Sequence, residues 1–235
     1  MSFIPRPDYY GLSIIYPGLT VYTSEANATA SEATALRPSG FAQAKAVFAK
    51  TSEPSVEYRA ENGVHAFAPV LGRVTMLDGK AHILTRVSIR HISSRPVSVI
   101  CEGRELPIAL AQDIYAFRLN AGFGIDIPTA LAVIPIGDAL ILAGELDRYA
   151  EHTLTFEADI IISTGARGDI CAYDLDTPRL TVSATIQRLG GEGAPEISVG
   201  KRWKVTGPLT PTNPANDYPA WNCELVRYLT PAEVE

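Results

Sequence analysis

Two carboxylates stand two residues apart in the stretch HTLTFEADIIIS, residues 152–163. In an extended strand, Glu157 and Asp159 share one face, with side chains about 7 Å apart. That separation is close to the one that glycosidases keep between a general acid and a general base. Charged residues on a solvated strand face are far more common, so this ordinary interpretation is favoured. An enzyme with an unrecognised carboxylate site is therefore the third hypothesis for the function.

Residue types that bind metal ions are dispersed along the chain. The four histidines are His65, His82, His91 and His152. They form no HxH or HExxH pattern, so the paired histidines of a cupin-type iron site are missing. Asp174 and Asp176 in YDLDTP could bind Ca²⁺ with backbone carbonyls, although Asp before Thr-Pro is also ordinary turn chemistry. No metal ligand or cofactor is predicted.

Motifs for nucleophilic catalysis and phosphate binding are also missing. The sequence has no GxSxG. The stretch SVGKRW, residues 198–203, contains Gly-Lys but lacks the earlier glycine and the following Ser or Thr of a phosphate-binding loop. The Arg-Gly-Asp tripeptide at 167–169 is short enough to occur by chance, and an exposed turn explains it. No catalytic residue is predicted, and the chain is expected not to be an enzyme.

Aromatic residues gather near the C-terminus. They are Trp203, Tyr218, Trp221 and Tyr228. On an exposed β face such residues would suit sugar stacking or a protein interface, while packing in the core is the alternative. A carbohydrate- or ligand-binding β-sandwich module is the second hypothesis.

Alternation of apolar and polar residues is the main structural signal after residue 62. In RLTVSATIQRL, residues 179–189, the residues expected to face inward are Leu180, Val182, Ala184 and Ile186. In 152–163 they are Leu154, Phe156, Ala158, Ile160 and Ile162, with Ile161 as an exception among the outward residues. Many such strands predict an all-β fold, an antiparallel β-sandwich that is jelly-roll-like.

The first part of the chain lacks this alternation. The run SEANATASEATALRPSG, residues 24–40, is rich in Ala, Ser and Thr. In FAQAKAVFAK, residues 41–50, Phe41, Ala44 and Phe48 fall on one helical face. The sequence therefore predicts one short helix at about 41–50.

Three parts follow from these patterns. Residues 1–62 are expected to be an extended N-terminal arm that contains the short helix. Residues 63–189 are expected to be the β-sandwich core, and residues 190–235 a C-terminal extension with late strands.

Composition restricts the class of protein. Of the 235 residues, 46% are hydrophobic and 20% are charged, which is typical of a globular chain. The formal net charge of -6 disfavours nucleic-acid binding through a general electrostatic field. No membrane-spanning stretch or signal peptide is recognised.

Cysteine usage is sparse. Cys101, Cys171 and Cys223 lie far apart, which argues against a disulfide framework and for a reducing compartment. Cys101 and Cys171 fall in strand-like runs and are expected to be small buried residues.

Many β-strands, long terminal segments and the lack of a recognised catalytic motif together predict a structural subunit of a large assembly. The first hypothesis is a virion component, of the capsid or the tail, whose terminal arms contact neighbouring subunits. Its partners would be copies of itself in a homo-oligomer and other assembly proteins, with no nucleic acid or membrane. Its location would be the virion or the cytoplasm, without secretion through a signal peptide.

Overall fold

A computed structural model describes most of the chain. The described residues are 10–12, 18–39, 42–60, 64–67, 70–77, 80–92, 95–107, 110, 117–118, 125–128, 139–166, 169–190, 193–212 and 218–234. Most of them are in strands, and the order of elements in this part of the chain contains no helix. Within this part of the chain, nothing has the length and apolar character of a membrane-crossing helix.

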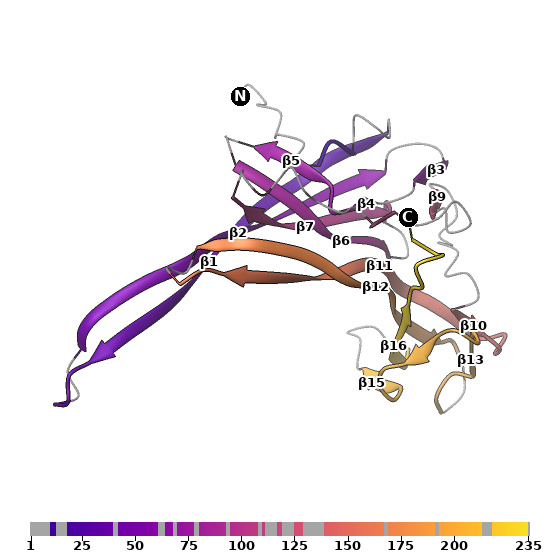
Figure 1. Cartoon of the computed structure of the whole chain (residues 1–235). Helices are drawn as coiled ribbons and strands as arrows, with labels where there is room; N and C mark the ends of the chain where they lie inside the picture. The colour runs from indigo at the N-terminus through magenta and orange to yellow at the C-terminus, as the bar shows by residue number, and fades with distance from the viewer. Residues whose placement is uncertain are drawn as a thin grey trace, which may run out of the picture.

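Of the sixteen strands in the described residues, ten form one antiparallel sheet. The strands are β1 (Leu19–Leu36), β2 (Ala42–Ala60), β3 (Val64–Phe67), β4 (Val70–Leu71), β5 (Val74–Leu77), β6 (Lys80–Ile92), β7 (Ser98–Leu106), β8 (Phe117–Arg118), β9 (Ile125–Pro128), β10 (Leu140–Leu142), β11 (Asp147–Thr164), β12 (Ile170–Arg188), β13 (Ile197–Val199), β14 (Lys204–Val205), β15 (Thr210–Thr212) and β16 (Ala220–Tyr228). The sheet order is β1-β2-β7-β6-β11-β12-β16-β14, with β5 on β6 and β15 on β16 (Figure 1). The pairs β3–β9, β4–β8 and β10–β13 stand apart from it. The predicted all-β antiparallel class is confirmed, but the sandwich and its jelly-roll topology are not.

The predicted helix at about 41–50 is wrong. Residues 42–60 form β2, which pairs antiparallel with β1, so that Ala46 lies opposite Ala33. The run at 24–40 is likewise a strand as far as Leu36. Helix propensity is worth only tenths of a kcal/mol per residue, and a long backbone ladder overrides it. Phe41 lies outside the described residues.

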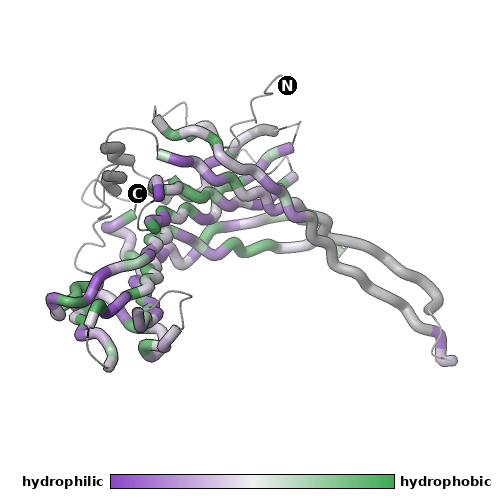
Figure 2. The backbone as a smooth tube through the Cα atoms, turned by 180° about the vertical axis from the view of Figure 1, so that it is seen from behind, coloured by the Kyte–Doolittle hydropathy of each residue, from purple (hydrophilic) through white to green (hydrophobic). Residues whose placement is uncertain are grey.

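One face of the large sheet is buried, as the alternation predicts. The four residues of β12 that were expected to face inward are each at most 5% exposed. Figure 2 shows apolar and polar residues alternating along the strands. Ile161, the apolar residue on the outward side, is 51% exposed. Thr155 alternates with the inward residues of 152–163 but is nevertheless buried, and its hydroxyl is hydrogen-bonded to that of Ser88 at 2.9 Å.

Tyr10 ties the N-terminal part of the chain to this core. Its ring is fully buried. Its backbone N–H donates to the Tyr58 hydroxyl at 3.3 Å, and its own hydroxyl donates to the Pro54 carbonyl at 3.4 Å. The Tyr10 hydroxyl lies against Gly103 of β7, where any Cβ would overlap it and the carbonyl oxygen of Ile83. Gly103 is therefore required by close approach of neighbouring atoms.

A long two-stranded segment begins where the sheet narrows. The ladder between β2 and β7 covers only Ser55–Arg59 of β2. It stops next to Pro54, whose nitrogen carries no hydrogen. Beyond that point, residues 26–36 of β1 and 42–54 of β2 pair only with each other within the described part; we call this segment the ribbon. At about 3.4 Å per residue it is roughly 35–40 Å long, and Figure 1 shows it projecting from the rest of the chain.

A second, shorter ribbon extends from β11 and β12. Residues 158–164 and 170–178 pair with each other beyond the ends of β6 and β16. This short ribbon rests on its own chain, since Ala158 and Leu175 are buried and the Tyr173 hydroxyl donates to the Leu110 carbonyl at 3.1 Å.

The C-terminal residues fold onto the same sheet. The Glu233 carboxylate accepts hydrogen bonds from the Thr230 N–H and hydroxyl, both at 2.9 Å, from Arg202 at 2.8 Å, and from Arg227. Burial opposes ionisation of this carboxyl, but the hydrogen bonds from Thr230 and Arg227 outweigh it and lower the pKa of Glu233 to about 2. Residues 218–234 are therefore held by their own chain.

Gly103→Ala is expected to lower the free energy of unfolding by about 1–3 kcal/mol, because the new methyl group collides with the Tyr10 hydroxyl and the backbone of β6. Urea unfolding measures the change. Gly207→Ala is the matched control, since nothing lies within 4 Å of its added Cβ. Equal stability of the two variants would contradict the close contact at Gly103.

Candidate functional site

Five charged side chains connect four strands on the exposed face of the sheet. Glu102 of β7, Arg86 of β6, Glu157 of β11 and Arg179 of β12 stand opposite one another in register. Arg86 lies 3.2 Å from Glu102 and 3.3 Å from Glu157. Arg179 lies 2.9 Å from Glu157 and 2.8 Å from Asp159. We call these residues the charged row.

Pairing within the charged row determines whether Glu157 and Asp159 could act as a general acid and base. Both carboxylates accept hydrogen bonds from the Arg179 guanidinium. The hydrogen bond from Arg179 lowers the pKa of Asp159, and the bond to Asp159 raises the pKa of Arg179. A general acid needs a raised carboxyl pKa. The arrangement therefore favours a structural ion-pair network over an acid and base pair.

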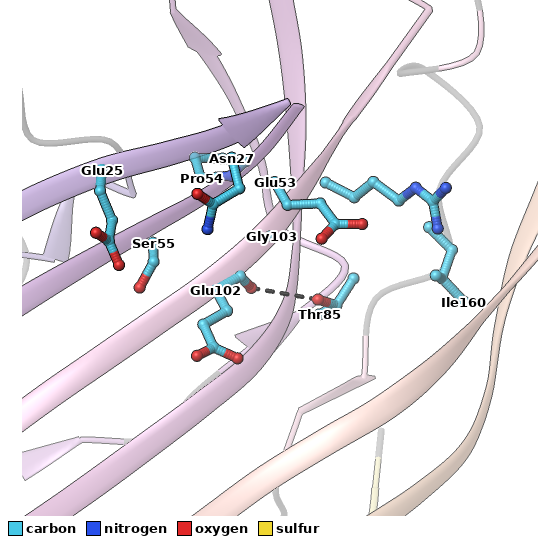
Figure 3. Close-up of a pocket in the computed structure, with 10 residues that line it drawn as sticks. Glu25, Asn27, Glu53, Pro54, Ser55, Thr85, Glu102, Gly103 and Ile160 are labelled. Carbon is cyan, nitrogen blue, oxygen red and sulfur yellow. Dashed lines mark hydrogen bonds between the residues drawn. The ribbon is translucent and has the colours of Figure 1, made fainter. Parts of the chain in front are cut away.

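An acidic hollow of about 320 Å³ lies at the root of the ribbon. Glu25, Glu53 and Glu102 line it, with Arg104 and Ile160 also on its wall (Figure 3). The backbone carbonyl of Glu102 accepts a hydrogen bond from the Thr85 hydroxyl at 3.3 Å. Glu25 and Glu53 form no ion pair among the described residues, and with Arg104 as the one cation in the lining the hollow carries a net negative charge.

A basic hollow of about 350 Å³ lies on the same face, nearer the opposite ends of the strands. Arg59, Arg90 and Arg95 line it. The Arg59 guanidinium carbon stacks 3.0 Å from the ring centre of Tyr22, and Arg90 bonds Glu151 at 2.6 Å. Arg95 has no carboxylate partner in the described part of the chain.

Three of the four histidines are buried in the sheet. His91 and His152 lie opposite each other on β6 and β11, with ring centres 5.0 Å apart. Burial lowers the pKa of both; for His152 the value falls to about 4, with a further lowering by His91 that Glu151 partly opposes. Neither ring nitrogen of His152 has a hydrogen-bond partner among the described residues. His152 is therefore a neutral packing residue at pH 7. The side chain of His65 lies outside the described part.

Asp174 and Asp176 lie on the exposed side of the short ribbon. Asp174 accepts the N–H of Leu175 at 2.8 Å, and Asp176 stands opposite Asp159. Thr177 next to them has a positive φ of 54° at a register shift, so DTP forms a β-bulge. In the described residues, no set of three or more His, Cys, Asp or Glu is placed to hold a metal ion.

The four C-terminal aromatic residues do not form one surface. Trp203 is buried, and Tyr218 lies 6.0 Å from the Arg148 guanidinium. Trp221 and Tyr228 are on β16 but on opposite faces of it, because their positions differ by seven, an odd number. These four residues therefore do not share a stacking platform of the kind that sugar binding would use.

The three cysteines are free thiols. Cys101 is buried as expected, whereas the expectation for Cys171 is wrong: it is exposed near the tip of the short ribbon, where its thiol donates to the Ser163 carbonyl at 3.3 Å. Arg167 and Gly168 of the Arg-Gly-Asp tripeptide lie outside the described residues.

Sequence reasoning found Glu157 and Asp159 but missed the other members of the charged row. Arg86 and Arg179 pair with these carboxylates, and Glu102 pairs with Arg86. These partners lie on other strands, and only the register brings them together. No protein-family model matches the chain, and neither does any curated protein.

Replacing Arg179 by Met should raise the pKa of Asp159 toward its ordinary value and lower the free energy of unfolding by about 1–2 kcal/mol, because Glu157 keeps only Arg86. Carbon-detected NMR titration reads the carboxyl pKa directly. Lys80→Met, which removes the exposed contact with Glu105, should change stability by less than about 0.5 kcal/mol. An unchanged Asp159 pKa in the Arg179 variant would refute the pairing.

His152 makes stability depend on pH. Since its folded pKa of about 4 lies below the ordinary 6.5, the unfolded chain binds more protons in mild acid. Its contribution is complete above about pH 6.5 and is lost as the pH falls through the folded pKa, a change of up to about 3 kcal/mol. His152→Phe should flatten this dependence in urea unfolding between pH 7 and pH 4. If the stability of the His152→Phe variant falls with pH as steeply as that of the parent, His152 is not the cause of the pH dependence.

Proposed function

We propose that this chain is a structural subunit of a large protein assembly, a capsid or tail component of a virion. The observation that carries the proposal is the projecting ribbon. A two-stranded hairpin is at best marginally stable alone in water and needs a third strand or a packing surface. Within the described part of the chain, no third strand pairs with residues 26–36 and 42–54. Neighbouring subunits would supply it.

The two edges of the sheet support this proposal because they differ. The β14 and β15 edge is short and interrupted by Pro208 and Pro211, which are devices that prevent pairing with other chains. The β1 edge runs from Leu19 to Leu36 without a proline. Register shifts, Glu25 and Glu32 interrupt this edge, but it is long and has no partner strand in the described part of the chain, which is hazardous in a monomer and useful in an assembly.

The exposed face also fits a mechanical role. Its ion pairs and its Ser88–Thr155 hydrogen bond link neighbouring strands across the sheet. In the predicted sandwich, the second layer would come from segments such as β4 and β10, whose Leu71 and Leu140 belong to the buried core. Partners would be further copies and other assembly proteins, in a virion or in the cytoplasm. The dispersed aromatic residues leave carbohydrate binding with less support.

A ribbon deletion tests the proposal. Replacing residues 28–52 by Asn-Gly, which favours a tight hairpin turn, keeps the buried residues Leu19, Val56 and Tyr58. Light scattering coupled to size-exclusion chromatography should show multimers for the full chain and a folded monomer for this variant, because the variant lacks the segment that needs a neighbour.

Shortening the other ribbon is the matched control. Replacing residues 164–171 by Asn-Gly removes only the tip of the short ribbon and should leave association intact. A full chain that stays monomeric at high concentration, or a ribbon-deleted chain that still assembles, would contradict the proposal.

A further inference from the structure

The ribbon has two open edges rather than one. On the outer side of β1, residues 26–36 have no partner strand in the described part of the chain, and on the outer side of β2 the same holds for residues 42–54. Each edge presents a row of backbone N–H and C=O groups that another strand could pair. Whatever completes the ribbon must satisfy both rows.

We infer that the ribbons of successive copies pair edge to edge, β1 of one copy against β2 of the next, so that one antiparallel sheet runs through the assembly. This inference rests on the proposed assembly function and names its contact. The partner is a second copy of this chain.

Symmetry favours a β1–β2 contact between copies over a two-fold β1–β1 contact. A two-fold pairing of β1 with β1 would complete the β1 edges and leave both β2 edges open. A head-to-tail contact completes both edges with one kind of interface, and the copies then form a closed ring or a filament. Because β1 and β2 run antiparallel within each hairpin, copies related by rotation place each β1 antiparallel to the neighbouring β2.

Charge favours the same choice. Within the ribbon, β1 carries Glu32 as its one charged residue, whereas β2 carries Lys45, Lys50 and Glu53. The β1 strand of the ribbon is therefore net acidic and the β2 strand net basic. Opposite charges on adjacent strands are stabilising, and like charges are destabilising. A β1–β1 contact would bring acidic strands together, whereas a β1–β2 contact joins opposite signs.

Cysteine cross-linking between mixed single variants distinguishes these contacts. All proteins carry Cys171→Ser to remove the exposed thiol. One set has a cysteine on β1 (Thr29→Cys, Ser31→Cys or Ala33→Cys), and the other has one on β2 (Ala44→Cys, Ala46→Cys or Phe48→Cys). Each variant holds one new thiol, so a disulfide through the ribbon positions must join two copies. The Cys171→Ser parent is the control for background cross-linking.

The expected result is a covalent dimer in at least one mixture of a β1 variant with a β2 variant, and none when either set is oxidised alone. Cross-linking within the β1 set, or no dimer in any mixture while the parent assembles, overturns the inference and leaves the assembly function standing. A parent that remains monomeric in light scattering overturns both.

A charge exchange tests the inference without cysteines. Glu32→Lys and Lys45→Glu should each weaken association at least tenfold, because each gives the two pairing strands the same sign of net charge. The double variant should recover association, since both signs are exchanged together. Circular dichroism checks that each variant keeps its strands. Single variants that are folded and associate like the parent would also overturn the inference.

Discussion

Burial of one face of a wide antiparallel sheet is the constraint on which this structure depends. The apolar residues of β12 and their opposite neighbours on β11 and β16 bury that face, and each fully buried side chain contributes about 1.5–3 kcal/mol. The period of two in the sequence fixes the register, because a slip of one residue would expose the whole apolar set. The register in turn places the charged row on the opposite face.

Two pairs of strands, β1–β2 and β11–β12, extend beyond their neighbours in the sheet and form the two ribbons. Pro54 ends the pairing of β2 with β7, and beyond it β1 and β2 continue with no third strand in the described part of the chain. The short ribbon of β11 and β12 also leaves the sheet, but it packs on its own chain through Tyr173 and Leu175. The two ribbons therefore differ in that the short ribbon packs on its own chain, whereas the edges of the β1–β2 ribbon have no partner strand in the described part of the chain. This difference is why the proposed contacts lie on the β1–β2 ribbon.

The sequence predicted well what depends on local pattern. The alternation in 179–189 identified a strand and its buried side, because burial of one face of a strand requires an apolar residue at every second position. The ribbon lacks this alternation, and the helical spacing of Phe41, Ala44 and Phe48 predicts a helix at 41–50, although pairing with β1 decides the outcome. The charged row escaped as well, because Arg86 and Glu157 are far apart in sequence and meet only through the register of β6 and β11.

Hydrogen–deuterium exchange of the ribbon amides tests the central claim most directly, because it reports on the backbone groups at the open edges. The account predicts that amides in residues 26–36 and 42–54 exchange slowly in concentrated, associated protein and rapidly after dilution, while the amides of β12 stay protected in both states. Equal exchange of the ribbon amides in the two states would contradict the account.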